Sequence, residues 1–215
     1  NNELGKGEFH NDSGPITVAN KKIDLKLLDE FQNAAEEVGI PKTIDFNTGD
    51  NLGVGFFQFT TSHTKKNFLK LRCSAAKGYL NPVKKRKNLK IVVHAHVQKI
   101  DFDGKKAVGV SFYQGDKIIS SKATKEVVLS AGAIGSPHLL NVSGIGNGEK
   151  LKELGIEVIH ELKGVGQNLQ DHLMMRPVYK VKNLKSLNRK VESLFGRFLM
   201  GLEYIIKQSV PVTMG

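Results

Sequence analysis

Cysteine is nearly absent from this chain of 215 residues, whose single thiol is Cys73. One cysteine excludes an internal disulfide and any metal site built from several cysteines, and it leaves the redox compartment undecided. Long apolar runs are absent too, because no stretch of about 18 apolar residues occurs. Hydrophobic residues make up 40% of the chain and charged residues 25%, enough to form a core. We therefore expect a soluble globular protein without a membrane span.

Negative charge is scarce: 21 Asp and Glu stand against 32 Lys and Arg, which gives a net charge of +11. The densest basic cluster is "KKRK" at Lys84–Lys87. Nucleic-acid sites usually interleave aromatic side chains for stacking, but only Tyr79 lies near this cluster, and Pro82 predicts a turn. We interpret the cluster as a solvated basic loop and expect no nucleic-acid partner. The alternative, a basic nucleic-acid-binding domain, predicts salt-sensitive retention on DNA or RNA.

The dinucleotide fingerprint G-x-G-x-x-G is missing as well. "GIGNGE" has its glycines at the wrong spacing, and "GVGQNL" at 164–169 lacks the third glycine. What the chain has is the apolar run "EVVLS" followed by "AGAIGSPHLLNVSGIG". This pattern predicts a buried strand at Glu126–Ser130 and a helix with Ser136 as N-cap and Pro137 at its first position. Such a helix start favours a negative group such as a pyrophosphate, although many turns of this kind bind nothing.

Turn residues and hydrophobic periodicity predict the remaining elements. A helix from Leu25 to Val38 is ended by Gly39 and Pro41, and a short helix at Ser74–Leu80 is halted by Asn81 and Pro82. A later helix ends at Gly155, and an amphipathic stripe from Val191 to Ile206 predicts a core-packing helix. The predicted strands are Gly55–Thr60, Leu89–Ile100, Ala107–Tyr113, Lys117–Ala123 and Ile156–Leu162, of which the third and fourth form a hairpin.

The histidines suggest several sites, none of them strongly. His94 and His96 lie two apart on a predicted strand, which is possible metal spacing, but no third ligand is identifiable. His172 follows Asp171 directly, and adjacent side chains on an extended chain point apart, so a structural role is favoured over a dyad. We assign no catalytic role to His138.

The fifteen-residue stretch "GAIGSPHLLNVSGIG" matches every fixed position of the second signature of the glucose-methanol-choline (GMC) family of flavin oxidoreductases. The matching positions are Gly132, Ala133, Ser136, Pro137, Leu139, Leu140, Ser143, Gly144, Ile145 and Gly146. Further blocks, among them "SGPITV", "RCSAAKGYLNP", "NLKIVVHAHVQKI" and "GVGQNLQDH", follow in family order. The "RCS" and "GVGQNLQDH" blocks most resemble insect glucose-dehydrogenase-type members.

The resemblance implies a mixed α/β and α+β fold. One part is a segment of a Rossmann-like FAD-binding domain, residues 74–171. The other is a substrate domain built on an antiparallel sheet, to which residues 1–73 and 172–215 belong. The resemblance also implies FAD as cofactor, with Val97 facing the adenine through its main chain and the strand end Ser130, Ala131 and Gly132 near the FAD. A buried strand valine is the alternative for Val97, and both readings can hold together.

The implied reaction is oxidation of an alcohol or sugar CH–OH group, with hydride transfer to FAD and electron transfer to oxygen or a quinone-type acceptor. The family's N-terminal glycine fingerprint and its catalytic-His segment have no counterpart here, so we expect a central fragment, incomplete at both ends and inactive alone. No catalytic or metal-binding residue is predicted. A non-catalytic truncated paralogue or binding module is the alternative. The compartment is undetermined, with an extracellular location suggested by the insect members.

Overall fold

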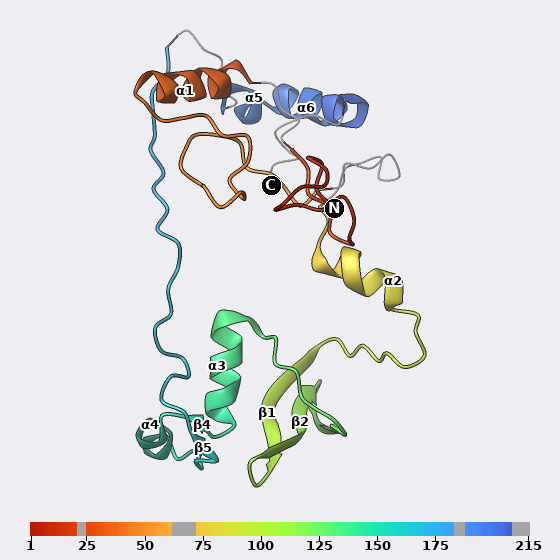
Figure 1. Cartoon of the computed structure of the whole chain (residues 1–215). Helices are drawn as coiled ribbons and strands as arrows, with labels where there is room; N and C mark the ends of the chain where they lie inside the picture. Colours follow the sequence, from red (N-terminus) through yellow and green to blue (C-terminus); the bar gives the residue numbers. More distant parts are fainter. Residues whose placement is uncertain (21–24, 62–71, 183–187, 208–215) are drawn as a thin grey trace. The chain divides into compact units, whose positions relative to one another are not determined.

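The computed structural model describes residues 1–20, 25–61, 72–182 and 188–207 (Figure 1). The chain forms two compact units: unit 1 comprises Asn1–Leu89 and Val178–Gly215, and unit 2 comprises Lys90–Pro177. As in the predicted partition, a middle segment is flanked by two outer segments that belong together. The predicted boundaries lie after residues 73 and 171, and the roles assigned to the segments stay predictions.

Unit 2 is built on an antiparallel sheet with the order β1-β2-β3. Its strands are β1 (Ala95–Asp103), β2 (Lys106–Gln114) and β3 (Lys117–Lys122). Two-residue turns join them, and Gly104 and Gly115 start these turns with positive φ angles of 55° and 60°. Glycine adopts such angles without strain, which is why the D-G and Q-G-D signals predicted the turns. The hairpin prediction is confirmed.

The predicted strand Leu89–Ile100 is wrong in its first half, because β1 begins only at Ala95. His94, just before it, has a φ of 53°, which breaks the alternation of an extended strand. His94 and His96 therefore do not share a strand face. The β-branched run Ile91–Val93 predicted a strand from local preference alone, but no ladder partner stands opposite it in the described residues.

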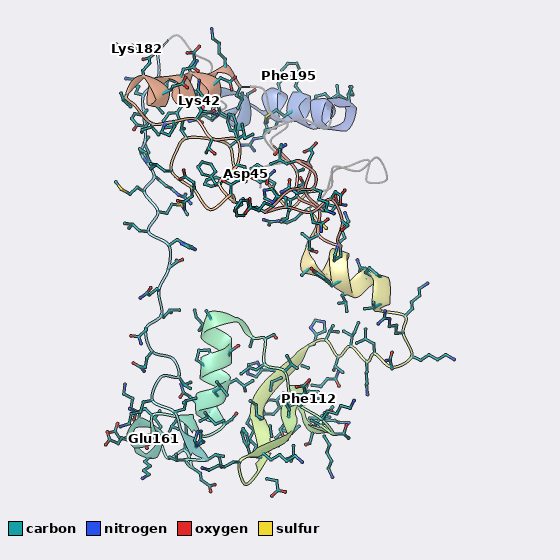
Figure 2. The ribbon with its side chains drawn as sticks, in the orientation of Figure 1. Lys42, Asp45, Phe112, Glu161, Lys182 and Phe195 are labelled. Atoms are coloured by element: carbon teal, nitrogen blue, oxygen red, sulfur yellow. The ribbon has the colours of Figure 1, made fainter. Side chains whose placement is uncertain are left out.

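Helix α3 (Gly132–Val142) packs against β1 (Figure 1). The buried Ser143 connects them: its hydroxyl accepts the Ile100 N–H at 2.9 Å and donates to the Leu139 carbonyl at 2.6 Å. Buried apolar side chains of this unit include Ile100, Leu151 and Phe112 on β2, the last of which is labelled in Figure 2. The buried side chains of unit 2 thus come from the sheet and from the segment that follows α3.

A short parallel pair completes unit 2. Strand β4 (Ile145–Gly146) pairs with β5 (His160–Glu161), with α4 (Gly148–Glu153) between them. The helix predicted before Gly155 is confirmed, and Gly155 follows it with a φ of 71°. The predicted strand Ile156–Leu162 is wrong in most of its length. Only His160 and Glu161 form a strand, because only they pair with β4.

The predicted buried strand Glu126–Ser130 is wrong. These residues are extended, but they form no ladder in the described part of the chain, and Val128 is 76% exposed. A buried strand needs a neighbour on each side, which a short apolar run cannot reveal from its own sequence.

Unit 1 has few regular elements. The predicted first helix is confirmed as α1 (Lys26–Glu37), and Gly39 follows it with a φ of 89°. Pro82 does not halt the second helix: a wide turn, η1 (Ala76–Leu80), leads directly into α2 (Asn81–Val83). A wide turn relieves the clash between a proline ring and the carbonyl four residues before it. The predicted strand Gly55–Thr60 is wrong, because its only pairing in the described residues is the isolated bridge between Phe59 and Ala19.

The last predicted helix is divided at Ser193 into α5 (Asn188–Glu192) and α6 (Leu194–Lys207). Its apolar stripe does not pack into a core, because Leu194, Phe195 and Phe198 are mostly exposed, whereas Met200 is buried. Periodicity predicts which face of a helix is apolar but not what covers it. No helix within the described ranges has the length and apolarity needed to cross a bilayer.

Candidate functional site

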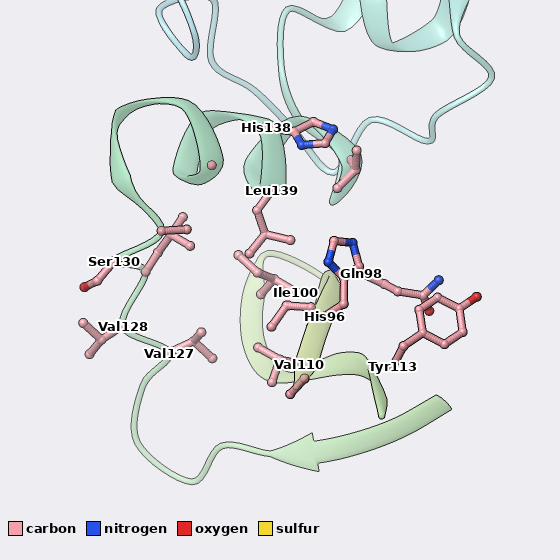
Figure 3. A pocket seen from close by; sticks show the side chains of 16 residues that line it. His96, Gln98, Ile100, Val110, Tyr113, Val127, Val128, Ser130, His138 and Leu139 are labelled. Atoms are coloured by element: carbon pink, nitrogen blue, oxygen red, sulfur yellow. The ribbon is translucent and has the colours of Figure 1, made fainter. Parts of the chain in front are cut away.

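A pocket of about 830 Å³ opens in unit 2 between three segments (Figure 3). Strands β1 and β2 form one side, α3 forms another, and the extended segment Val127–Ala131 forms the third. Most of its lining is apolar, with Ile100 and Val110 from the sheet and Leu139 from α3. Its size and apolar character are typical of sites for small molecules and cofactors.

Three of the four predicted cofactor residues line this pocket: Val97 from β1 and Ser130 and Ala131 from the extended segment. Gly132 is not among the lining residues but begins α3 directly beside them, with a φ of 85° and open space around it. The structure therefore brings together residues separated by more than thirty positions in sequence. Their role in cofactor binding stays a prediction.

The main chain of Val97 faces away from the sheet. Strand β1 is an edge strand, and the Ile100 N–H points to its free side because it is donated to Ser143. The direction of the N–H groups alternates along a strand, but the register shift between Val97 and Lys99 inserts one extra residue. Val97 therefore presents its own N–H and C=O to the free edge of the sheet, where a ligand can pair with them.

Helix α3 starts five residues before the predicted position. Ser136 and Pro137 lie inside the helix, and Ala131 occupies the position before its first residue. The Ser136 hydroxyl still serves the helix start, because it accepts the Ala131 N–H at 3.0 Å. The predicted N-cap hydroxyl would accept an N–H from a later residue, whereas the Ser136 hydroxyl accepts the N–H of Ala131, five residues earlier. The positive φ of Gly132 allows the chain to turn into the helix early.

Sequence reasoning missed four polar residues of the pocket: His96 and Gln98 on β1, Tyr113 on β2 and His138 on α3 (Figure 3). His96 and His138 lie 42 positions apart, so no local motif joins them. The signal that could have found His138 is its place in the helix that follows the glycine-rich junction, two residues after Ser136.

The remaining histidine hypotheses find no support. The Asp171 carboxylate accepts the main-chain N–H of His172 at 2.8 Å rather than a ring nitrogen, and both residues are exposed. Within the ranges that the structure describes, no cluster of three or more His, Cys, Asp or Glu side chains could hold a metal ion.

Comparison with known families shows which family the chain belongs to. The family described as GMC oxidoreductase matches residues 6–174, most of the chain. The chain belongs to the GMC oxidoreductase family. An oxygen-dependent choline dehydrogenase of Pectobacterium atrosepticum is 41% identical over 186 residues, which cover 86% of this chain and 32% of that protein. The Escherichia coli K12 protein of the same name is 42% identical over 188 residues, 86% of this chain and 33% of the relative.

The fold has a solved counterpart. An FAD-dependent oxidoreductase from Chaetomium thermophilum superimposes with a TM-score of 0.82 at 29% identity, over 97% of this chain and 36% of that one. The prediction of a mixed α/β fragment with an antiparallel sheet is confirmed. The chain spans about a third of the length of these three proteins.

Proposed function

We propose that this chain supplies one side of an FAD site in a GMC oxidoreductase, and that the unit 2 pocket holds the adenine end of the cofactor. The observation that carries this proposal is the outward-facing main chain of Val97, beside Ser130 and Ala131 in one apolar pocket. A purine presents a donor and an acceptor on one edge and flat apolar faces. An exposed strand edge with aliphatic walls fits both.

The residues around the pocket have separable roles in this proposal. The Val97 N–H and C=O would fix the base, while Val110, Val127 and Leu139 would exclude water from its faces. Gly132 leaves the approach to the first amides of α3 open, because nothing lies within 4 Å of where a side chain would begin. The start of the helix favours the negative charge of a phosphate group.

We further propose that the enzyme oxidises the CH–OH group of a small-molecule alcohol. Bound FAD would supply the hydride acceptor. The relatives named choline dehydrogenases favour an amino alcohol of the choline type, and their description as oxygen-dependent favours oxygen over a quinone-type acceptor. A substrate of the insect glucose-dehydrogenase type has no support from these relatives and is the second candidate. In this proposal residues 74–171 serve the cofactor, and residues 1–73 and 172–215 serve the substrate.

The adenine proposal is tested by titrating the 215-residue chain with AMP and with FAD and following its amide NMR signals. We expect weak binding, with shifts centred on Val97 and Ala131, and a purified chain without yellow colour. The decisive pair is Val97→Pro against Val97→Ala. Proline is tolerated on the free side of an edge strand but lacks the N–H, whereas alanine keeps it. Val97→Pro should weaken AMP binding on the order of 10-fold, as expected for one lost hydrogen bond.

Equal AMP affinity in Val97→Pro and the unchanged chain would overturn main-chain recognition. An absence of any AMP-dependent shift in the pocket would overturn the adenine site itself and favour a non-catalytic module. The alcohol proposal is tested separately, by assaying choline and glucose oxidation with the coding sequence extended to the length of the relatives. Oxidation of neither compound would count against it.

A further inference from the structure

The net positive charge of this protein comes from one segment. Between Asn51 and Ile100 the chain has eleven Lys or Arg and no Asp or Glu. The other 165 residues contain 21 of each sign, so this segment accounts for the whole net charge of +11. An interval of fifty residues without one carboxylate is uncommon when 21 are distributed over 215 residues. The segregation indicates a surface that attracts an anionic partner.

The cations at the centre of this segment are free to meet such a partner. Lys84, Lys85, Arg86 and Lys87 follow α2, and all four are exposed. None of them forms an ion pair with any residue in the described ranges. Four adjacent cations repel one another in the free protein, and an anionic surface would relieve that repulsion.

Apolar side chains flank the same four cations. Tyr79 is 58% exposed, and Leu80 and Leu89 are each 37% exposed. The buried Gly78 explains the exposure of Tyr79 and Leu80: a side chain at position 78 would meet the Ile16 Cδ1 atom at 2.7 Å and the Pro15 carbonyl at 2.9 Å. The helix is therefore seated on the Pro15–Ile16 segment through Gly78, and residues one and two positions further on turn away from that contact.

We propose that Tyr79–Leu89, the basic-apolar surface, docks on a membrane leaflet rich in anionic phospholipid. The cations would meet the lipid phosphates while Tyr79, Leu80 and Leu89 enter the headgroup region, as in peripheral membrane segments. A nucleic acid is the less favoured partner, because single-stranded sites stack bases on several aromatic side chains, and this surface has only Tyr79. The contact is peripheral and needs no membrane-spanning helix.

The test is co-sedimentation of the 215-residue chain with vesicles of phosphatidylcholine, alone or with phosphatidylglycerol. We expect binding only to the vesicles that contain phosphatidylglycerol, and less of it as salt rises. The variant K84Q/K85Q/R86Q/K87Q should lose binding on the order of 1,000-fold, from the contribution of each of the four basic residues at an anionic surface. The matched control is K105Q/K106Q/K117Q/K122Q, which removes four exposed cations from the β1-β2-β3 sheet and should retain most of the binding.

Equal losses in the two quadruple variants would overturn the proposal, because they would show attraction by net charge alone. The double variant Tyr79→Ser with Leu80→Ser keeps every charge and separates lipid from other polyanions. It should weaken vesicle binding about 10-fold or more through the lost apolar contact. Unchanged vesicle binding in this variant, or displacement of the vesicles by single-stranded RNA at equal phosphate concentration, would overturn the lipid assignment. Circular dichroism melting checks that each variant remains folded.

Discussion

Unit 1 and unit 2 are each stabilised by a different kind of hydrogen bond. In unit 2 the main chain provides most of the order, through the ladders of the β1-β2-β3 sheet, the β4-β5 pair and helix α3. In the described part of unit 1, the β pairing is limited to isolated bridges such as Asn2 with Val18 and Lys42 with Val54. Besides a few main-chain hydrogen bonds, such as those between Ala19 and Phe59, side chains join its distant segments. The comparison predicts that unit 2 is sensitive to backbone conformation and unit 1 to the identity of a few polar side chains.

Four polar side chains of unit 1, Asn2, His10, Asp45 and Gln58, form a cluster in which Asn2 and Asp45 are buried (Asp45 is labelled in Figure 2). The His10 Nε2 atom donates to the Asp45 carboxylate, and the Asn2 amide donates to His10 Nδ1 at 3.2 Å. Asn2 and Gln58 exchange two further hydrogen bonds, of 3.0 and 3.1 Å, although they lie 56 positions apart. Because the Asn2 amide nitrogen can only donate, His10 must carry its proton on Nε2. The cluster holds the N-terminal segment to the loop after α1.

The largest expected effect is Gly144→Ala in unit 2. Gly144 has a φ of 86°, and a side chain there would meet the Glu157 carbonyl at 2.4 Å, so both conformation and space oppose it. We expect a loss of about 3 kcal/mol or more in the free energy of unfolding, measured in urea. The matched control is Gly155→Ala, where φ is 71° but nothing lies within 4 Å, and which should cost only about 1 kcal/mol. Equal losses of unfolding free energy in the two variants would show that the close contact with the Glu157 carbonyl has no effect.

The second effect is Asp45→Asn in unit 1, which removes the buried carboxylate that His10 and the Asn47 N–H share. We expect a loss of about 2 kcal/mol, since a charge-assisted hydrogen bond in a buried site is replaced by a weaker one. Asp50→Asn is the control, because Asp50 also accepts an N–H two residues on, from Leu52 at 3.0 Å, but is exposed. Hydrogen exchange at the Asn47 and Leu52 amides reports both sites. A loss as large in Asp50→Asn would contradict the cluster's importance.

The third effect is Ser143→Ala, which leaves the Ile100 N–H of β1 buried without its acceptor. It should cost about 1–2 kcal/mol, the penalty for an unsatisfied buried donor. Ser136→Ala removes the other serine hydroxyl of the α3 region, whose bond to the Ala131 N–H is exposed, and should cost about 0.5 kcal/mol. Thermal melting compares the two variants. A reversed order would mean that the link between α3 and β1 does not limit the stability of unit 2.

The smallest effect is the pH dependence of unit 1. Burial raises the pKa of Asp45, but the hydrogen bonds from Asn47 and His10 outweigh it and hold the pKa below its ordinary value of 3.8. A lowered pKa in the folded state stabilises the fold above 3.8, and this contribution is lost as the pH falls through the folded value. Between about pH 5 and pH 2, unit 1 should lose more stability in the unchanged chain than in Asp45→Asn. Parallel losses would show that other groups cause the acid sensitivity.

Turn residues and hydrophobic periodicity predicted correctly those elements that depend only on neighbouring residues. The helix α1 and its glycine stop, the turns of the β1-β2-β3 sheet and the helix before Gly155 each depend on a few neighbouring residues. Predictions that needed a distant partner failed. In the part of the chain that the structure describes, the run Glu126–Ser130 has no strand beside it, and Leu194, Phe195 and Phe198 of the α6 stripe are exposed. Pairing and burial depend on segments that local periodicity does not identify.

By itself the sequence determined the family, because the ten signature positions between Gly132 and Gly146 specify a turn, a helix and a chain reversal that few other residues permit. It also determined that Val97 and Ser130–Gly132 are the cofactor candidates. Only the tertiary structure decided that Val97, Ser130 and Ala131 face one pocket, together with His96 and His138. The physical reason is that α3 packs on the edge strand β1. This packing brings two distant segments together, and the local sequence of neither segment predicts the contact.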